Sequence, residues 1–204
     1  MKGIIKNDIL VFKASWKPFV FIFLVFFAVT FFTEHVLLFG NAVMYMIVAS
    51  MIQTQHINDL SSGWLLYCNA APVSRKDYIK SRYILMVSLL FAILLIFMLL
   101  FPLNPHLVKH GLFKYFCENV ILMTIALITC ALTMPVILKV KENTAKIAAS
   151  LTAGVITGLS SLFSINLQFV EPHIIIIILC AAISLPLLCA SYKISCKIYE
   201  GKDI

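Results

Sequence analysis

The chain has 204 residues, of which 62% are hydrophobic and only 12% are charged, and its mean hydropathy is +1.01. A soluble domain carries roughly a quarter of its residues as charges, so this composition excludes an ordinary water-soluble fold and favours an integral membrane protein. The formal net charge of +7 falls in short basic clusters between long apolar runs, which indicates membrane topology signals and argues against nucleic-acid binding.

Residues 1–17 precede the first apolar run and are predicted to form an amphipathic helix at the membrane interface. Ile5, Ile9 and Phe12 fall on one helical face, and the lysines of the segment lie off it. The alternative is a solvated basic leader that only fixes topology. The apolar run that follows has no small-x-small cleavage site, so we expect a retained first helix and not a removed signal peptide.

Six apolar runs are long enough to cross about 30 Å of hydrocarbon at 1.5 Å per residue. These predicted spans are residues 18–33, 36–52, 83–103, 119–138, 147–163 and 173–192. The predicted fold class is therefore an all-α membrane protein with one six-helix transmembrane domain over residues 18–192. Residues 193–204 are left as a short tail, and no internal repeat is visible.

The lysines and arginines orient the six spans. Fourteen of the sixteen lie before the first span, between the second and third, between the fourth and fifth, or after the sixth, and only Lys109 and Lys114 lie on the other side. The positive-inside rule then places both termini in the cytoplasm. The chain is also rich in Ile, Phe and Lys, a residue usage typical of AT-rich bacterial genomes. We therefore expect a multi-pass protein of a bacterial plasma membrane.

Motifs that carry chemistry are absent from the sequence. There is no G-x-x-x-x-G-K-[ST] loop for ATP, and the predicted spans hold no Asp, Glu, Arg or His away from their ends, which disfavours an ion-coupled carrier. The six cysteines form no C-x-x-C pair, and His106 and His110 lack an H-E-x-x-H context. We therefore expect neither a catalytic site nor a metal site in this chain.

Two features of the later spans concern helix packing. Gly154 and Gly158 form a G-x-x-x-G motif that Ser150 extends by one turn, so another helix could approach closely there, either from the same chain or from a second copy. Pro135 and Pro186 are predicted to bend the fourth and sixth spans, and both gating and ordinary packing would explain such bends.

The loop over residues 53–82 is the most informative segment. Leu60, Trp64 and Tyr67 recur at helical spacing, which predicts a short amphipathic helix on the membrane surface that ends at Pro72. The physical pattern alone fits two interpretations equally. One is an interfacial linker with Trp64 as its anchor, and the other is a docking surface for a cytoplasmic partner.

A second helix is predicted to begin directly after this break. Ser74-Arg75-Lys76-Asp77 matches the S-x-x-[DE] capping pattern, in which the Ser74 hydroxyl accepts a hydrogen bond from a free backbone N–H. The loop is thus predicted to be a helix, a break and a second helix that continues into the third span.

At this loop the sequence resembles the ABC-2 type of ABC-exporter permease. The residues that carry the resemblance are Asp59, Gly63-Trp64, Tyr67 and the stretch 72–78, while residues 2–13 resemble the family's amphipathic elbow helix. The layout is similar over nearly the whole chain, and it resembles the short permeases that export amphipathic peptides, such as the phenol-soluble modulin exporters. The chain departs from the family in leaving only residues 164–172 for the small extracellular helices that often precede the last span.

The resemblance implies a half-transporter. Two permeases, identical or paralogous, would enclose the path, and two ABC ATPase subunits would dock below and hold the ATP and Mg²⁺, with no cofactor in this chain. The segment 59–67 would be the docking helix, and the turn at 72–78 would transmit its motion to the third span. The residues to which this coupling role is carried over are Asp59, Trp64, Tyr67, Pro72, Ser74, Arg75 and Tyr78.

The leading hypothesis from the sequence is therefore the membrane subunit of an ATP-driven exporter, surrounded by lipid and moving amphipathic peptides or similar hydrophobic compounds. The first alternative is a membrane immunity or sensor protein that binds a partner at the same loop without driving transport. An ion-coupled carrier is a further alternative.

Overall fold

The computed structural model describes residues 37–61, 74–104, 111–140 and 174–201 continuously, together with single helical positions at 13, 17, 20–22, 24, 25, 28, 108, 109, 144, 147, 154 and 158. Every long element in these ranges is a helix: α2 (Leu37–Ser61), α4 (Arg75–Leu100), α6 (Leu112–Lys139) and α8 (Ile174–Glu200). A short 3-10 turn, η1 (Phe101–Leu103), follows α4. The described part of the chain is therefore all-helical, as the sequence predicts.

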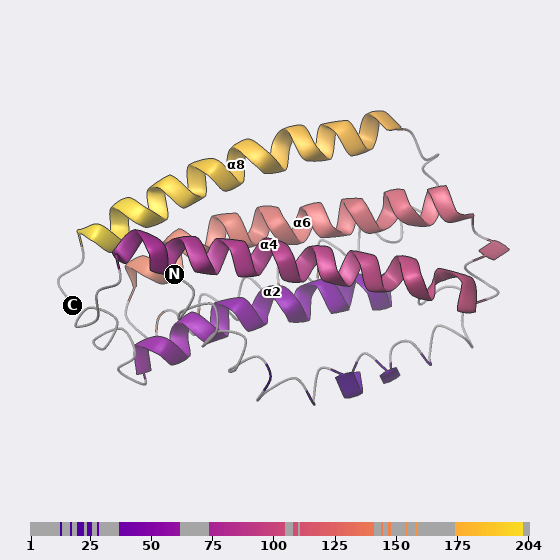
Figure 1. Ribbon diagram of the computed structural model, residues 1–204, viewed down its shortest axis with the longest axis horizontal. Coiled ribbons are helices and arrows are strands. Elements are labelled where there is room, and N and C mark those ends of the chain that lie inside the picture. Colours follow the sequence, from indigo (N-terminus) through magenta and orange to yellow (C-terminus); the bar gives the residue numbers. More distant parts are fainter. Residues whose placement is uncertain are drawn as a thin grey trace.

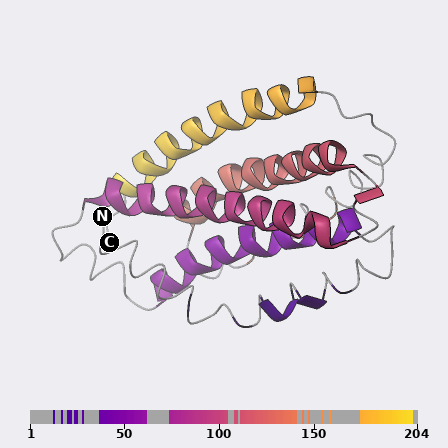
Figure 2. The same cartoon turned by 45° about the vertical axis from the view of Figure 1, so that its right-hand side comes forward.

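The four long helices lie side by side along the length of the molecule (Figure 1) and remain so when it is turned (Figure 2). α6 packs on α8 and α2, and α4 packs on α2, α6 and α8. Met86 and Leu90 of α4 and Leu122 and Ala126 of α6 are fully buried and belong to one apolar core. The last turns of α2, α6 and α8 and the first turn of α4 share one end, the left-hand end of Figure 1.

Three of the described helices are long and apolar enough to cross a membrane: Arg75–Leu103, Leu112–Lys139 and Ile177–Glu200. Large apolar side chains such as Leu95, Leu99 and Leu185 are exposed on their outer faces. A water-soluble protein would not leave so many in contact with water, whereas lipid is a suitable solvent for them. The first and fifth predicted spans fall mostly outside the described residues, so the total of six spans stays a prediction.

The helices extend beyond the spans predicted from hydropathy. The second span was expected to end at residue 52, but α2 continues to Ser61, and the third was expected to begin at residue 83, but α4 begins at Arg75. α8 likewise runs to Glu200, through most of the expected tail. The added turns are rich in polar residues, which hydropathy excludes from a span, although several of them are buried between helices.

The predicted start, at Ser74, of the helix that continues into the third span is confirmed. Ser74 has extended backbone angles (φ −72°, ψ 144°), and its hydroxyl oxygen accepts a hydrogen bond from the backbone N–H of Asp77 at 3.1 Å. The acidic side chain of Asp77 also lies in the first turn, where it complements the positive end of the helix dipole. Local sequence therefore determines where α4 begins.

Ser74→Ala should lower the free energy of unfolding by about 1 kcal/mol, because the Asp77 N–H would lose its acceptor. Ser74→Asp, which keeps an acceptor at the cap, should retain wild-type stability. Thermal unfolding of the purified permease in detergent measures both. Equal losses for the alanine and aspartate variants would contradict the capping role.

The two packing features have different outcomes. α6 and α8 continue as helices through Pro135 and Pro186, so neither proline ends its helix. At Gly154 and Gly158, a Cβ added to the backbone would meet no atom of the described residues within 4 Å, and a close approach by another part of this chain stays a prediction. Ser150 lies outside the described residues, and contact of this face with a second copy remains a prediction.

Candidate functional site

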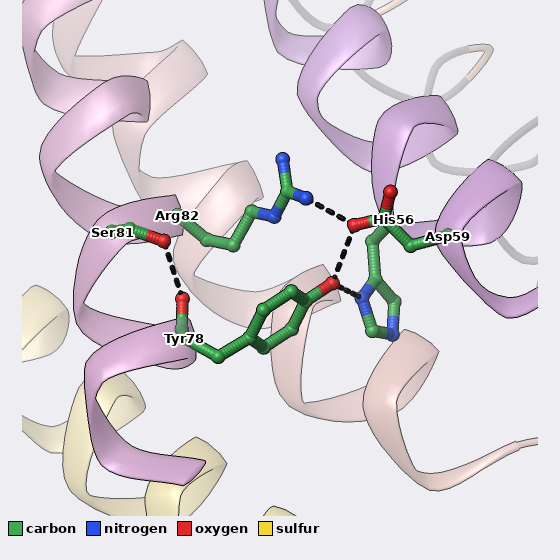
Figure 3. Close-up of polar contacts among 5 residues, drawn as sticks. All are labelled: His56, Asp59, Tyr78, Ser81 and Arg82. Carbon is green, nitrogen blue, oxygen red and sulfur yellow. Dashed lines mark hydrogen bonds and ion pairs between the residues drawn. The ribbon is translucent and has the colours of Figure 1, made fainter. Parts of the chain in front are cut away.

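A buried polar cluster lies at the end of the bundle where α2 finishes and α4 begins (Figure 3). α2 contributes His56 and Asp59, three residues apart, and α4 contributes Tyr78 and Arg82, four residues apart. Both spacings place the two side chains on one face of their helix. We call these four residues the elbow cluster, because they connect the two helices on either side of the loop.

The elbow cluster is centred on the Asp59 carboxylate. The Arg82 guanidinium forms an ion pair with it, and the Tyr78 hydroxyl donates to the same carboxylate oxygen, Oδ2, at 2.8 Å. The Tyr78 hydroxyl oxygen also lies 2.8 Å from His56 Nδ1. A hydroxyl has one proton to donate, so His56 must carry its own proton on Nδ1 and donate it to the tyrosine oxygen.

All four side chains of the cluster are buried. Arg82 is 0% exposed and Asp59 6%, and the Arg82 guanidinium carbon lies 5.1 Å from the centre of the Tyr78 ring. Removing both charges from water costs free energy, which their attraction and the added hydrogen bond offset. Loss of either charge would leave the other buried without its counter-charge, so the pair holds α2 and α4 in one relative position.

A second set of contacts joins the start of α4 to the end of α8. The Arg75 guanidinium donates to the backbone carbonyls of Glu200 at 3.0 Å and Tyr199 at 3.4 Å, and Lys76 Nζ lies 3.1 Å from Glu200 Oε1. The last carbonyls of a helix have no partner within that helix and form the negative end of its dipole, so a cation is favourable there. Tyr78 also stacks on Tyr199, with ring centres 5.3 Å apart and an interplanar angle of 20°.

Further buried polar contacts join the helices along their length. Gln53 Nε2 of α2 donates to Thr133 Oγ1 of α6 at 2.8 Å. Near the opposite end, Asn41 Nδ2 donates to the Tyr115 hydroxyl at 3.0 Å and to Asn119 Oδ1 at 3.1 Å. Such contacts stabilise a bundle in lipid because the apolar surroundings offer no competing partners. They position the helices at separate places. The contacts of the elbow cluster, in contrast, are centred on one carboxylate.

The structure brings four of the seven predicted coupling residues to this end of the bundle. Ser74 caps α4, Arg75 binds the end of α8, and Asp59 and Tyr78 belong to the elbow cluster. Trp64, Tyr67 and Pro72 lie outside the described residues. Because Asp59 and Tyr78 are buried, they face the inside of the bundle and not a partner. Ser74, in contrast, is exposed at the surface.

Sequence reasoning missed four residues of the site: His56, Arg82, Tyr199 and Glu200. A signal was present for Arg82, which is one of only two arginines in the chain and directly precedes a long apolar run. No comparable signal marks Tyr199 or Glu200, whose partners lie more than 120 residues earlier. In the described part of the chain, no three His, Cys, Asp or Glu residues are grouped so as to hold a metal ion.

The apolar outer faces and the long helices together define a multi-pass helical membrane protein. The family model described as "ABC-2 family transporter protein" matches residues 3–200. The chain therefore belongs to the ABC-2 transporter family and is a membrane permease of an ABC transporter, a class that works with an ABC ATPase. Searches of curated proteins and of solved structures found no match.

Proposed function

We propose that this chain is one half of the permease of an exporter in a bacterial plasma membrane, with both termini in the cytoplasm. The ATPase partner docks on the segment between α2 and α4, which contains Trp64, Tyr67 and Pro72. A second copy or a paralogue completes the path. ATP and Mg²⁺ bind to the ATPase, and this chain contributes no catalytic group or cofactor of its own.

The observation that carries the proposal is the position of the elbow cluster. The Asp59–Arg82 pair ties together the two helices that enter and leave the proposed docking segment. A force on that segment would otherwise separate or bend the helix ends. With the pair formed, α2 and α4 move as one body.

The motion then has a route to a third helix. Arg75 and Tyr78 bind the end of α8 through the Tyr199 and Glu200 contacts, so displacement of the start of α4 displaces α8 as well. Closure of the ATPase pair would thus rotate three helices together, which is the kind of rigid-body movement that opens and closes transport paths. The elbow cluster transmits the movement and performs no chemistry.

We propose an amphipathic peptide, or a hydrophobic compound of similar character, as the exported substrate. The support is the resemblance of the layout to short peptide-exporter permeases. Expression in a strain that is sensitive to an amphipathic peptide tests it: the permease and its ATPase together should lower the peptide retained in the cells. Retention unchanged for peptides of either charge would exclude this substrate class.

The proposed docking is tested by expressing the chain with the ATPase of the neighbouring gene and purifying the permease in mild detergent. We expect the ATPase to be retained and its hydrolysis rate to change on binding. A wild-type permease that never retains an ATPase would exclude the exporter and leave the immunity or sensor alternative.

Trp64→Ala and Arg75→Glu should each reduce the ATPase recovered with the permease or its substrate-stimulated turnover by about tenfold, a change worth about 1.4 kcal/mol. Arg75→Glu removes the cation from the end of α8 and places an anion against its carbonyls. Lys139→Glu, at an exposed position at the end of α6, and Leu95→Ala, on the outer face of α4, are the matched controls. Wild-type ATPase recovery and turnover in both test variants would show that the loop is only a linker.

A further inference from the structure

An open groove of about 710 Å³ lies between α4 and α8, on the outside of the bundle. On α4 its lining begins at Lys80 and ends at Phe91, and on α8 it extends from Leu188 to Tyr192. The α4 residues of the lining recur every three or four positions, so they form one stripe along the helix. We call this feature the α4–α8 groove.

The groove has the depth of a single lipid leaflet. Phe91 lies eleven positions after Lys80, which is about 16 Å along a helix axis and about half of a 30 Å hydrocarbon core. The groove begins close to the elbow cluster, at the end assigned to the cytoplasm by the topology proposed above. It therefore spans the inner leaflet and stops near the middle of the bilayer.

The chemistry of the groove changes along its length. Lys80 is exposed at its outer end and forms no ion pair with any residue that the structure describes. Next along the groove from Lys80, the rings of Tyr83 and Tyr192 pack edge to face, with their centres 5.5 Å apart. The remaining lining is almost entirely apolar. A ligand that fits this arrangement has a negative head, an interfacial region beneath it and an acyl chain.

We propose that the α4–α8 groove binds an anionic phospholipid of the cytoplasmic leaflet, with its phosphate at Lys80 and an acyl chain along the stripe to Phe91. Lys80 disfavours a cationic amphipathic peptide in the same place. The bound lipid would contact both α4 and α8, the two helices that Arg75 also joins. It would fill the groove between them on the outside of the bundle. The inner-leaflet assignment rests on the proposed orientation, but the binding itself does not depend on transport.

The test uses the purified full-length permease without ATPase or nucleotide, so its outcome is independent of the exporter proposal. Native mass spectrometry after incubation with phosphatidylglycerol or phosphatidylcholine of the same acyl chains measures the lipid retained. Wild-type protein should retain phosphatidylglycerol preferentially. Lys80→Ala should lower that preference by about fivefold, as expected for one basic side chain at a charged lipid surface. Lys139→Ala, at an exposed lysine at the same end of the bundle, should leave it unchanged.

A second variant examines the acyl-chain part of the groove. Ser88→Phe places a ring in the lining and should reduce retention of both lipids, with thermal unfolding used to select only folded protein. The proposal is wrong if wild-type protein retains both lipids equally, if Lys139→Ala lowers the preference as much as Lys80→Ala, or if folded Ser88→Phe retains lipid normally. Displacement of phosphatidylglycerol by a cationic amphipathic peptide from wild-type and Lys80→Ala protein alike would assign the groove to the peptide.

Discussion

Arg82→Met should lower the free energy of unfolding of the permease by about 3–5 kcal/mol, one of the two largest effects that we expect from a single substitution. Asp59 would keep its carboxylate among buried neighbours after losing the Arg82 charge, while the hydrogen bond from Tyr78 of α4 would remain. Chemical or thermal unfolding in detergent measures the loss. Lys139→Met removes a basic side chain from an exposed position and should change stability little.

The double variant Asp59→Leu with Arg82→Met separates the stability of the pair from its function. Because neither charge remains buried, it should be more stable than either single variant. It would nevertheless lack the ion pair that joins α2 to α4. We therefore expect a folded permease that still binds its ATPase but moves less substrate for each ATP hydrolysed. Additive losses in the double variant would show that the two charges do not stabilise each other.

Tyr78 should show the second large effect, because its side chain contacts both α2 and α8. Tyr78→Phe removes the hydroxyl that donates to Asp59 and accepts from His56, and it should cost about 1.5–3 kcal/mol, the usual value of a hydrogen bond to a charged group. Tyr78→Ala also removes the ring that stacks on Tyr199, and it should cost about 3–5 kcal/mol through the cavity it leaves.

The functional measurement for Tyr78 is the ratio of substrate moved to ATP hydrolysed in reconstituted vesicles. The ratio should fall moderately in Tyr78→Phe, which keeps the contact with α8, and severely in Tyr78→Ala. Tyr45→Phe is the matched control, because the Tyr45 ring is fully buried against Phe97 and its hydroxyl has no hydrogen-bond partner in the described structure. A ratio that falls equally in Tyr45→Phe and Tyr78→Phe would remove the argument for a specific coupling role.

Features that depend on composition or on a few neighbouring residues could be predicted from the sequence. Membrane character follows from the shortage of charge, and the start of α4 follows from a serine and an aspartate three residues apart. The membership of the ABC-2 family agrees with the resemblance found at the loop. In each case the information lies within a short window or in the overall composition.

The elbow cluster could not be predicted in the same way. Hydropathy ended the second span near residue 52 because His56 and Asp59 are polar, but a polar residue can be buried when its partner is on a neighbouring helix. Asp59 and Arg82 are 23 residues apart, and Arg75 lies 125 residues from Glu200. Pairing over such separations depends on how the helices pack, which a single sequence does not state.

The contacts of Arg75 and Lys76 also have a consequence for biogenesis. During synthesis, α4 enters the membrane well before Glu200 exists, so the contacts to the end of α8 cannot form at that stage. Basic residues beside a newly inserted helix hold that end in the cytoplasm. Once α8 is in place, the same two side chains bind its last turn. Arg75 and Lys76 would therefore serve first as orientation signals for an inserting helix and later as the contacts that attach α8 to α4.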